Sequence, residues 1–267
     1  MKKGAPLKMK WSEEAKEAVL RVPFFVRKRV IDQVEEEALK KGADSVTLGH
    51  VRSCQKRFLN RMEDEVKGYQ VETCFGPGGC CHRAFTCDSL VHDLEQQMSR
   101  QDLKAFFKER VDGPLKMHHE FRISISDCPN ACSRPQIADI GLIGACEPIV
   151  TDKDCSECGA CVEACKEKAL SIQHGRPVVD EGLCLYCGAC VRLCPSGTIA
   201  EGRAGYRIQI GGKLGRHPRL AIDLPGIYKP DDLTEVIDKC LQHYKRHCLN
   251  GERFGEVLKR TGSDIGL

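Results

Sequence analysis

Eight of the 18 cysteines in this 267-residue chain follow one spacing, C-x2-C-x2-C-x3-C, twice over. The first copy is Cys155, Cys158, Cys161 and Cys165, and the second is Cys184, Cys187, Cys190 and Cys194. In loops of this spacing three thiolates reach three irons of a cubane, and the fourth reaches the neighbouring cluster. We therefore predict one [4Fe–4S] cluster on Cys155, Cys158, Cys161 and Cys194, and another on Cys165, Cys184, Cys187 and Cys190.

A pair of zinc knuckles is the alternative for this repeat. A four-cysteine zinc site normally uses two C-x2-C pairs with a longer loop between them, and neither copy has that form. The Gly159-Ala160 pair of the first copy recurs as Gly188-Ala189 in the second. Over about residues 150–200 the segment resembles bacterial two-cluster ferredoxins, which implies an electron-transfer module.

Four further cysteines form a second constellation from two distant segments. Cys74 and Cys80 frame a C-x5-C loop rich in glycine and proline, and Cys128 and Cys132 form a C-x3-C pair. Glycine lets the backbone approach a bulky cofactor closely. A pair one turn apart suits the start of a helix, where free N–H groups favour anionic ligands. The residues therefore indicate one cluster site assembled from two loops.

This combination of C-x5-C with a distant C-x3-C resembles the siroheme and [4Fe–4S] motif of sulfite and nitrite reductases. The run Asp127–Gly144 strengthens the likeness, and Gly205–Arg219 resembles the strand and loop that follow the inserted ferredoxin in dissimilatory-type sulfite reductases. The likeness covers about residues 70–267. It implies a third [4Fe–4S] cluster on Cys74, Cys80, Cys128 and Cys132, with Cys132 also bridging to the siroheme iron.

The resemblance also implies cations for the carboxylates of siroheme. Five basic residues lie in or beside the matching loops: Arg83, Arg134, Lys213, Arg216 and Arg219. Each of them could equally be a solvated surface charge, which is the common fate of arginine and lysine. His82 and His217 could donate to a substrate oxyanion or could simply close a loop.

Residues 1–68 do not resemble the usual first half of that family and are predicted to be helical. Ser12 is the expected N-cap of the first helix, and Gly42 is the expected stop of the second. A third helix follows, with Phe58 and Met62 expected to face inward.

The pattern from Trp11 through the run Val22–Arg27 to Gly42 resembles the small C-terminal helical domain of the light-independent protochlorophyllide reductase B subunit. That domain recurs beside other reductases, so the resemblance does not require chlorophyll chemistry. The simplest interpretation of this N-terminal domain is a small domain used for packing or docking.

The remaining segments are expected to support the cysteine loops. Residues 84–110 predict helix, whereas Phe121–Ser126 and Tyr206–Ile210 alternate as strands do. A last helix has Asp232 and Glu235 in positions typical of a capping box. Its predicted inner face consists of Leu233, Val236, Ile237, Cys240, Leu241 and Tyr244.

The predicted fold class is α+β, in three parts. A small helical domain covers residues 1–68, and a siroheme and [4Fe–4S] reductase-like domain covers 69–149 and 200–267. A bacterial-type 2[4Fe–4S] ferredoxin domain is inserted at 150–199. Six cysteines remain outside the motifs and are expected to be buried apolar thiols, although the role of Cys81 is open. They are Cys54, Cys81, Cys87, Cys146, Cys240 and Cys248.

Composition excludes several classes of protein. The 41 basic and 38 acidic side chains give a formal net charge of +3, which offers no electrostatic reason to expect nucleic acid or a membrane surface as partner. No apolar run approaches the length of a spanning helix. The segment Met1–Lys10 carries lysines without an apolar core after them, so we expect no secretory signal and a cytoplasmic protein with reduced thiols.

Two functions compete on these observations. The first is a sulfite or nitrite reductase in which an external donor protein feeds the ferredoxin clusters and siroheme reduces the oxyanion by six electrons. The second is an iron–sulfur electron-transfer subunit without siroheme or substrate. The complete cysteine motif and the Gly211-Gly212-Lys213 loop favour the first, and the missing first half favours the second. A reductase of another substrate is a third possibility, and the family makes a homo- or hetero-oligomer plausible.

Overall fold

The computed structural model describes residues 9–266, and for residues 59–62 it describes the backbone only. Residues 1–8 and the side chain of Met62 therefore lie outside the described residues. Met62 was expected to face inward. The chain forms two compact units. The first runs to Val66 and includes Gly113–Lys116, and the second comprises Lys67–Asp112 and Met117–Leu267.

The first unit consists of three helices and two short parallel strands. They are β1 (Lys10–Trp11), α1 (Glu13–Leu20), α2 (Phe24–Lys40), β2 (Ser45–Val46) and α3 (Leu48–Glu65). Ser12 caps α1 as predicted, since its side chain accepts a hydrogen bond from the Ala15 N–H at 3.3 Å. Gly42 follows α2 with a φ of 68°, the left-handed conformation that glycine adopts after a helix.

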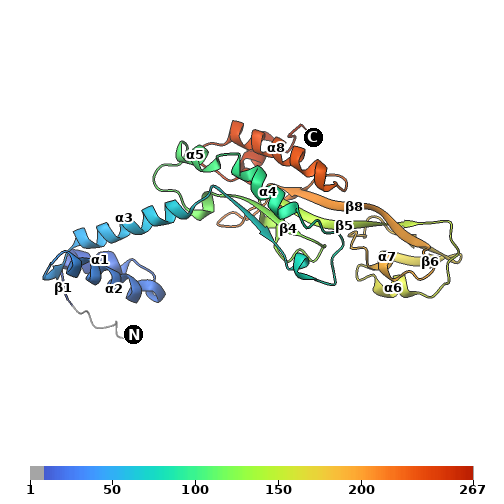
Figure 1. Ribbon diagram of the computed structural model, residues 1–267, viewed down its shortest axis with the longest axis horizontal. Helices are drawn as coiled ribbons and strands as arrows, with labels where there is room; N and C mark the ends of the chain where they lie inside the picture. Colours follow the sequence, from blue (N-terminus) through green and yellow to red (C-terminus); the bar gives the residue numbers. More distant parts are fainter. Residues whose placement is uncertain (1–8, 267) are drawn as a thin grey trace. The chain divides into compact units, whose positions relative to one another are not determined.

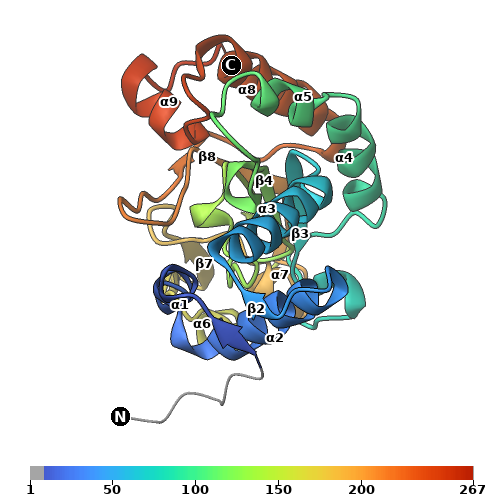
Figure 2. The same cartoon turned by 90° about the vertical axis from the view of Figure 1, so that its left-hand side faces the viewer.

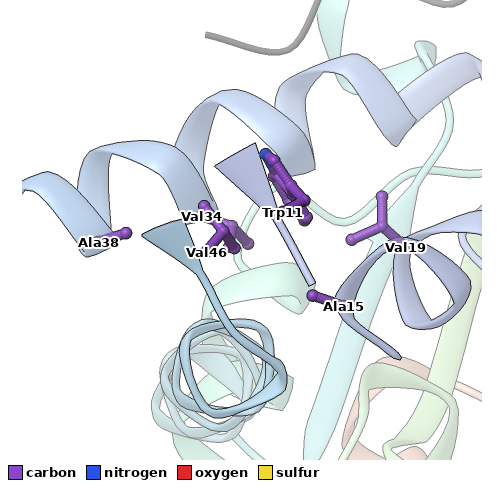
Figure 3. Packing of buried hydrophobic residues seen from close by; sticks show 6 residues of the cluster. All are labelled: Trp11, Ala15, Val19, Val34, Ala38 and Val46. Carbon is purple, nitrogen blue, oxygen red and sulfur yellow. The ribbon is translucent and has the colours of Figure 1, made fainter. Parts of the chain in front are cut away.

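A small aliphatic core with one tryptophan holds this unit together. Figure 3 shows its buried members, which are Trp11, Ala15, Val19, Val34, Ala38 and Val46. The Trp11 indole N–H donates to the buried Glu35 carboxylate at 3.0 Å, so the one polar atom of the ring has a partner. The expectation for Phe58 was wrong, because this side chain is 60% exposed. On α3, the side chains of Val51 and Cys54 pack against this core. Phe58 lies one turn beyond Cys54, past the end of the core.

A five-stranded mixed sheet forms the centre of the second unit. Its strands, in spatial order, are β3 (Tyr69–Thr73), β4 (Phe121–Ser126), β5 (Ile140–Val150), β8 (Ile199–Ile210) and β9 (Ile222–Asp223). The first three are parallel, and β8 is antiparallel to both of its neighbours. Parallel neighbours require crossover connections, which explains why helices separate β3 from β4 in the sequence.

Four helices gather on one side of this sheet (Figures 1 and 2). They are α4 (Leu90–Ser99), α5 (Leu103–Lys108), α8 (Pro230–His247) and α9 (Phe254–Thr261). Phe121 of β4 contacts Tyr244 and Phe254 with ring centroids 5.3 and 5.6 Å apart, at tilted angles typical of aromatic packing. The last helix that the sequence predicted is α8, and its predicted inner face is confirmed, since all six of its residues are buried.

The start of that last helix differs from the prediction. The helix begins at Pro230 with Lys229 as its cap, three residues before the predicted cap Asp232, and the Lys229 N–H donates to the Asp232 carboxylate at 3.2 Å. Proline lacks an N–H and has a φ suited to the first helical position, so Pro230 starts the helix early. Asp232 therefore occupies the third position of the helix, and Glu235 has no part in the cap.

A segment between β5 and β8, residues 151–198, forms a small lobe that we call the insert. It contains α6 (Ala160–Ala164), β6 (Leu170–Gln173), β7 (Arg176–Val179) and α7 (Ala189–Leu193). The strands β5 and β8 remain paired from Ile140↔Ile210 out to Val150↔Ile199, with one bulge between Cys146 and Pro148. In Figure 1 the insert lies beside the end of this two-stranded ribbon. The mixed architecture confirms the predicted α+β class.

No helix formed by the described residues combines the length and the apolar character that a membrane span requires.

Candidate functional site

Two neighbouring strands bring the distant cysteine loops of the second constellation together. β3 and β4 pair in parallel from Tyr69↔Phe121 to Thr73↔Ile125, so both strands end at the same edge of the sheet. Cys74 directly follows β3, and its N–H donates to the Ile125 carbonyl at 3.0 Å. The Asp127 N–H then donates to the Cys74 sulfur at 3.4 Å. We call Cys74, Cys80, Cys128 and Cys132 the split site.

The thiols of the split site lie close enough to influence one another electrostatically. Burial raises the pKa of Cys128, and the charges of Cys132, Cys74 and Cys80 raise it further, against a hydrogen bond from the Asn130 backbone. Cys132 is exposed, whereas Cys128 is buried. The structure thus gathers the four residues, with Cys132 on the accessible side, and their ligand role stays a prediction.

Asp127 supports both loops of the split site. Its carbonyl accepts hydrogen bonds from the Ala84 and Phe85 N–H groups at 2.8 and 3.2 Å, and Thr86 donates to its carboxylate at 3.0 Å. Burial raises the pKa of this carboxyl, while the Thr86 hydrogen bond lowers it. A Cβ on Gly76 would lie 2.1 Å from the Asp127 carboxylate, so only glycine fits there. This role was not predicted from the sequence, although an acidic residue directly before Cys128 was a signal.

The eight cysteines of the insert divide between two cavities. A smaller cavity is lined by Cys155, Cys158, Cys161 and Cys194, which we call the Cys155 set. A cavity of about 150 Å³ is lined by Cys165, Cys184, Cys187 and Cys190, which we call the Cys165 set. These are the two crossed groups that the spacing predicts, each with three cysteines from one repeat and the fourth from the other.

Backbone N–H groups point at the sulfurs of all three groups. Cys74, Cys155 and Cys184 each accept from the N–H two residues later, at 3.2, 3.4 and 3.5 Å. Cys165 accepts from Ala169 at 3.2 Å, and Cys194 accepts from Ile199 at 3.3 Å. Such hydrogen bonds stabilise thiolates and are a recognised influence on cluster potentials.

The repeat in sequence is also a repeat in backbone conformation. Glu157 and Tyr186, each two residues after the first cysteine of its copy, have φ values of 52° and 59°. Left-handed conformations are costly for such side chains and persist where the surroundings impose them. In both copies this conformation turns the residue's N–H toward the first sulfur of the motif.

The donor set suits iron–sulfur clusters, because the groups gathered around the two cavities of the insert are cysteine thiols. Within residues 9–58 and 63–266, no three His, Cys, Asp or Glu side chains are placed to hold a single metal ion. Burial raises the pKa of Cys190 to about 11, while backbone hydrogen bonds hold the pKa of Cys194 below its ordinary value despite burial. Soft thiolate ligands of this kind suit iron–sulfur clusters.

The five predicted cations have different surroundings. Lys213 forms an ion pair with Glu256, and the Arg219 guanidinium donates to the Gly255 carbonyl at 2.7 Å. Both residues close the base of a hairpin, since their backbones exchange hydrogen bonds of 2.9 and 3.0 Å. Arg216 lies exposed in the same hairpin.

The other two predicted cations lie by the split site. Arg134 is exposed two residues after Cys132, with a left-handed φ of 61°. Arg83 is half-buried, and its charge acts on Asp127 to lower the pKa of that carboxyl. His82 lines the larger cavity, whereas His217 is exposed in the hairpin.

The six unassigned thiols are only partly as predicted. Cys146, Cys240 and Cys248 are buried, which confirms the expectation for them. Cys81 is exposed, so the expectation of a buried thiol was wrong there, and Cys54 and Cys87 are half-buried. Cys81 lies in a turn beside the exposed His82, which places it at the surface.

Comparison with known proteins divides the chain at the same place as the structure. Residues 68–264 match the family model described as "Nitrite and sulphite reductase 4Fe-4S domain", and residues 11–54 match "Proto-chlorophyllide reductase 57 kD subunit". The resemblances to sulfite and nitrite reductases and to the protochlorophyllide reductase domain are confirmed.

Curated relatives agree with the first match. The Coenzyme F420-dependent sulfite reductase of Methanocaldococcus jannaschii is 36% identical over 191 residues, covering 71% of this chain and 28% of that protein. One subunit of the anaerobic sulfite reductase of Salmonella typhimurium is 31% identical over 140 residues, covering 48% of this chain and 39% of that one. The chain thus spans well under half of these relatives.

A solved structure, the crystal structure of dissimilatory sulfite reductase I, superposes with a TM-score of 0.51 at 18% identity. The superposition covers 78% of this chain and 55% of that one, and it shows a shared fold.

Proposed function

Because the chain belongs to the nitrite and sulphite reductase 4Fe-4S domain family over residues 68–264, we propose that it is a sulfite- or nitrite-reducing oxidoreductase. In this proposal the Cys155 set and the Cys165 set each hold a [4Fe–4S] cluster. The split site holds a third, which Cys132 links to siroheme.

One observation carries the proposal: the loops that contain the four cysteines follow β3 and β4 at their shared end, where two backbone N–H groups donate to the Cys74 sulfur. An electron carrier alone has no need of this site, because the insert already contains two complete cysteine sets. The curated relatives are a sulfite reductase and a sulfite reductase subunit, which supports sulfite as the substrate class.

Siroheme coupled to a cluster would supply the capacity to pass electrons in single steps to an oxyanion. The chain's own residues provide the surroundings. Asp127 and Gly76 fix the Cys74 loop, and Cys132 is exposed. Arg134 and Arg216 are the exposed predicted cations, suited to carboxylates or to an anionic substrate.

Lys213 and Arg219 serve differently in this proposal. Their side chains bind Glu256 and the Gly255 carbonyl, so they hold the hairpin that carries Arg216. An approaching carboxylate would compete with Glu256 for the Lys213 ammonium. The charges offered to the cofactor are therefore those of Arg134 and Arg216.

An electron-transfer subunit without siroheme is the second candidate. The observation that favours it is the first unit, which is a helical domain where a full reductase has its other half. An external donor protein and a cytoplasmic location belong to both candidates, and under this one a partner subunit would carry the catalytic site.

Metal and pigment analysis of the protein purified without oxygen separates the two. The reductase requires about 13 irons per chain and an extractable isobacteriochlorin, whereas the carrier requires about 12 irons and no pigment. A protein fully loaded with iron but free of pigment would overturn the reductase proposal. Sulfite- and nitrite-dependent oxidation of a reduced dye would then assign the substrate.

A further inference from the structure

The larger cavity of the insert has a second wall that does not belong to the insert. Besides the Cys165 set, it is lined by Cys128, Pro129 and Asn130 of the split site and by His82 from the C-x5-C loop. The smaller cavity has no lining residue from the split site. Of the two cysteine sets in the insert, the Cys165 set is therefore the one that faces the split site.

Arg192 connects these two walls. It lies on α7 between Cys190 and Cys194, and its side chain lines the larger cavity. One guanidinium nitrogen donates to the Arg83 carbonyl at 3.0 Å and to the Cys187 carbonyl at 3.3 Å. A single side chain thus bonds the C-x5-C loop and the second cysteine loop of the insert.

The wall on the insert side is held firmly around this arginine. The Cys146 N–H donates to the Tyr186 carbonyl at 2.7 Å, which fixes the loop to β5. A Cβ on Gly188 would lie 2.9 Å from the Cys146 side chain and 3.2 Å from the Arg192 guanidinium. The absence of a side chain at Gly188 therefore leaves the space that the Arg192 guanidinium and the Cys146 side chain occupy beside the Cys165 set.

We propose that Arg192 is a positioning residue that holds the Cys165 set against the split site and places a positive charge beside the cluster bound there. The inference rests on the proposed function, because it requires clusters at both sites. Reduction of a [4Fe–4S] cluster adds one electron and no proton, so a neighbouring cation stabilises the reduced form. Arg192 therefore directs electrons toward the Cys165 set in preference to the Cys155 set.

Three substitutions separate the two parts of this role. Arg192→Met removes both the charge and the hydrogen bonds, Arg192→Gln removes the charge and leaves a shorter amide donor, and Arg192→Lys keeps the charge but not the forked donor. The matched control is Arg176→Met. Arg176 is also in the insert and donates to the Thr151 carbonyl at 2.6 Å, but it adjoins Pro177 of the other cavity.

The experiment is a redox titration followed by electron paramagnetic resonance, with dithionite as the one-electron reductant. In the Met and Gln variants the equilibrium share of electrons on the Cys165 set, relative to the Cys155 set, should fall by roughly threefold to tenfold. Lys should retain the wild-type share. Amide exchange at Ala84, which follows the Arg83 carbonyl, should accelerate in the Met and Lys variants.

The outcomes are distinguishable. If the wild-type protein contains too little iron to fill two clusters in the insert, the proposed function is overturned, and this inference with it. Full clusters with an unchanged electron share and unchanged Ala84 exchange in Arg192→Met overturn the role of Arg192 alone. An equal shift of the Cys165 set in Arg176→Met would show that any charge in the insert suffices, which also overturns it.

Discussion

The insert and the split site gather their cysteines by different means. In the insert, each set draws on two short loops that copy one another in spacing and in backbone conformation. In the split site, four cysteines come from loops that a whole helical crossover separates, and the register of β3 with β4 brings them together.

The difference shows what each site depends on. The cysteine sets of the insert rely on local turns and on backbone N–H donors within those turns. The paired strands β5 and β8 connect the insert to the sheet. The split site relies on the sheet, on Asp127 and on the close approach at Gly76. We therefore expect that a substitution that removes the cluster from one site leaves the clusters of the other site in place.

Cys74→Ala should have the largest effect. It should remove the split-site cluster, or about four irons, together with any pigment, and leave both insert clusters in place. Iron analysis with visible and paramagnetic resonance spectra measures this. The matched variant Cys184→Ala should also lose about four irons but keep the pigment. Loss of all clusters from either variant would show that the sites are not independent.

The crossed cysteine sets lead to a second prediction, in which the expected effect is the loss of one cluster. Cys155→Ala and Cys194→Ala should abolish the same signal, and the double variant should lose no more than either single one. Cys155→Ala with Cys184→Ala should lose two signals. If Cys194 instead behaves as a partner of Cys184, the crossing is wrong.

Gly76→Val tests the dependence of the split site on close packing. The new side chain must displace the Asp127 carboxylate, so we expect a loss of about 2–3 kcal/mol in stability and of iron at the split site only. Gly78→Ala is the control, because a Cβ there meets nothing within 4 Å. Thermal unfolding and iron content report both effects, and equal behaviour of the two variants would refute the packing argument.

Cys240→Ser tests a thiol outside both sites. Cys240 is fully buried in α8, and burial raises the pKa of its thiol to about 12. A hydroxyl at this position should cost about 1–2 kcal/mol, because serine brings a polar group into an apolar core. Iron content should stay at the wild-type value, and any loss of a cluster would assign Cys240 a ligand role.

The smallest effect is expected in the first unit, where none of the three predicted cluster sites lies. Hydrogen bonds from Lys41 and Arg57 lower the pKa of Glu37 to about 2, from an ordinary value of 4.5. A lowered folded-state pKa stabilises above pH 4.5, and this contribution is lost as the pH falls toward 2. Glu37→Gln should flatten the acid limb of a pH titration of unfolding. An unchanged acid limb would contradict the pairing.

The sequence predicted best what is encoded locally. The Ser12 cap and the inner face of α8 follow from spacing alone and are confirmed. The cysteines of each crossed set line one cavity, and their ligand role stays a prediction. The residue types indicated that the Cys74 and Cys128 loops form one site, and the family resemblance strengthened this, but the strand register that brings them together is not visible in a single chain.

Features that depend on contacts between distant segments were missed. The support from Asp127 and the bonds of Arg192 to two loops require knowledge of which loops meet. The exposure of Phe58 depends on where a neighbouring core ends, which helical periodicity does not show. The ion pair of Lys213 likewise needed the position of α9.

The ribbon of β5 and β8 has a consequence for how such a chain could arise. Its two strands leave the sheet and return to it as hydrogen-bonded neighbours, with Val150 opposite Ile199 at the outer end. A tight hairpin turn could join these residues without shifting the register of any strand in the sheet. An ancestral gene could therefore have gained or lost the insert in one recombination event and still encoded a folded protein.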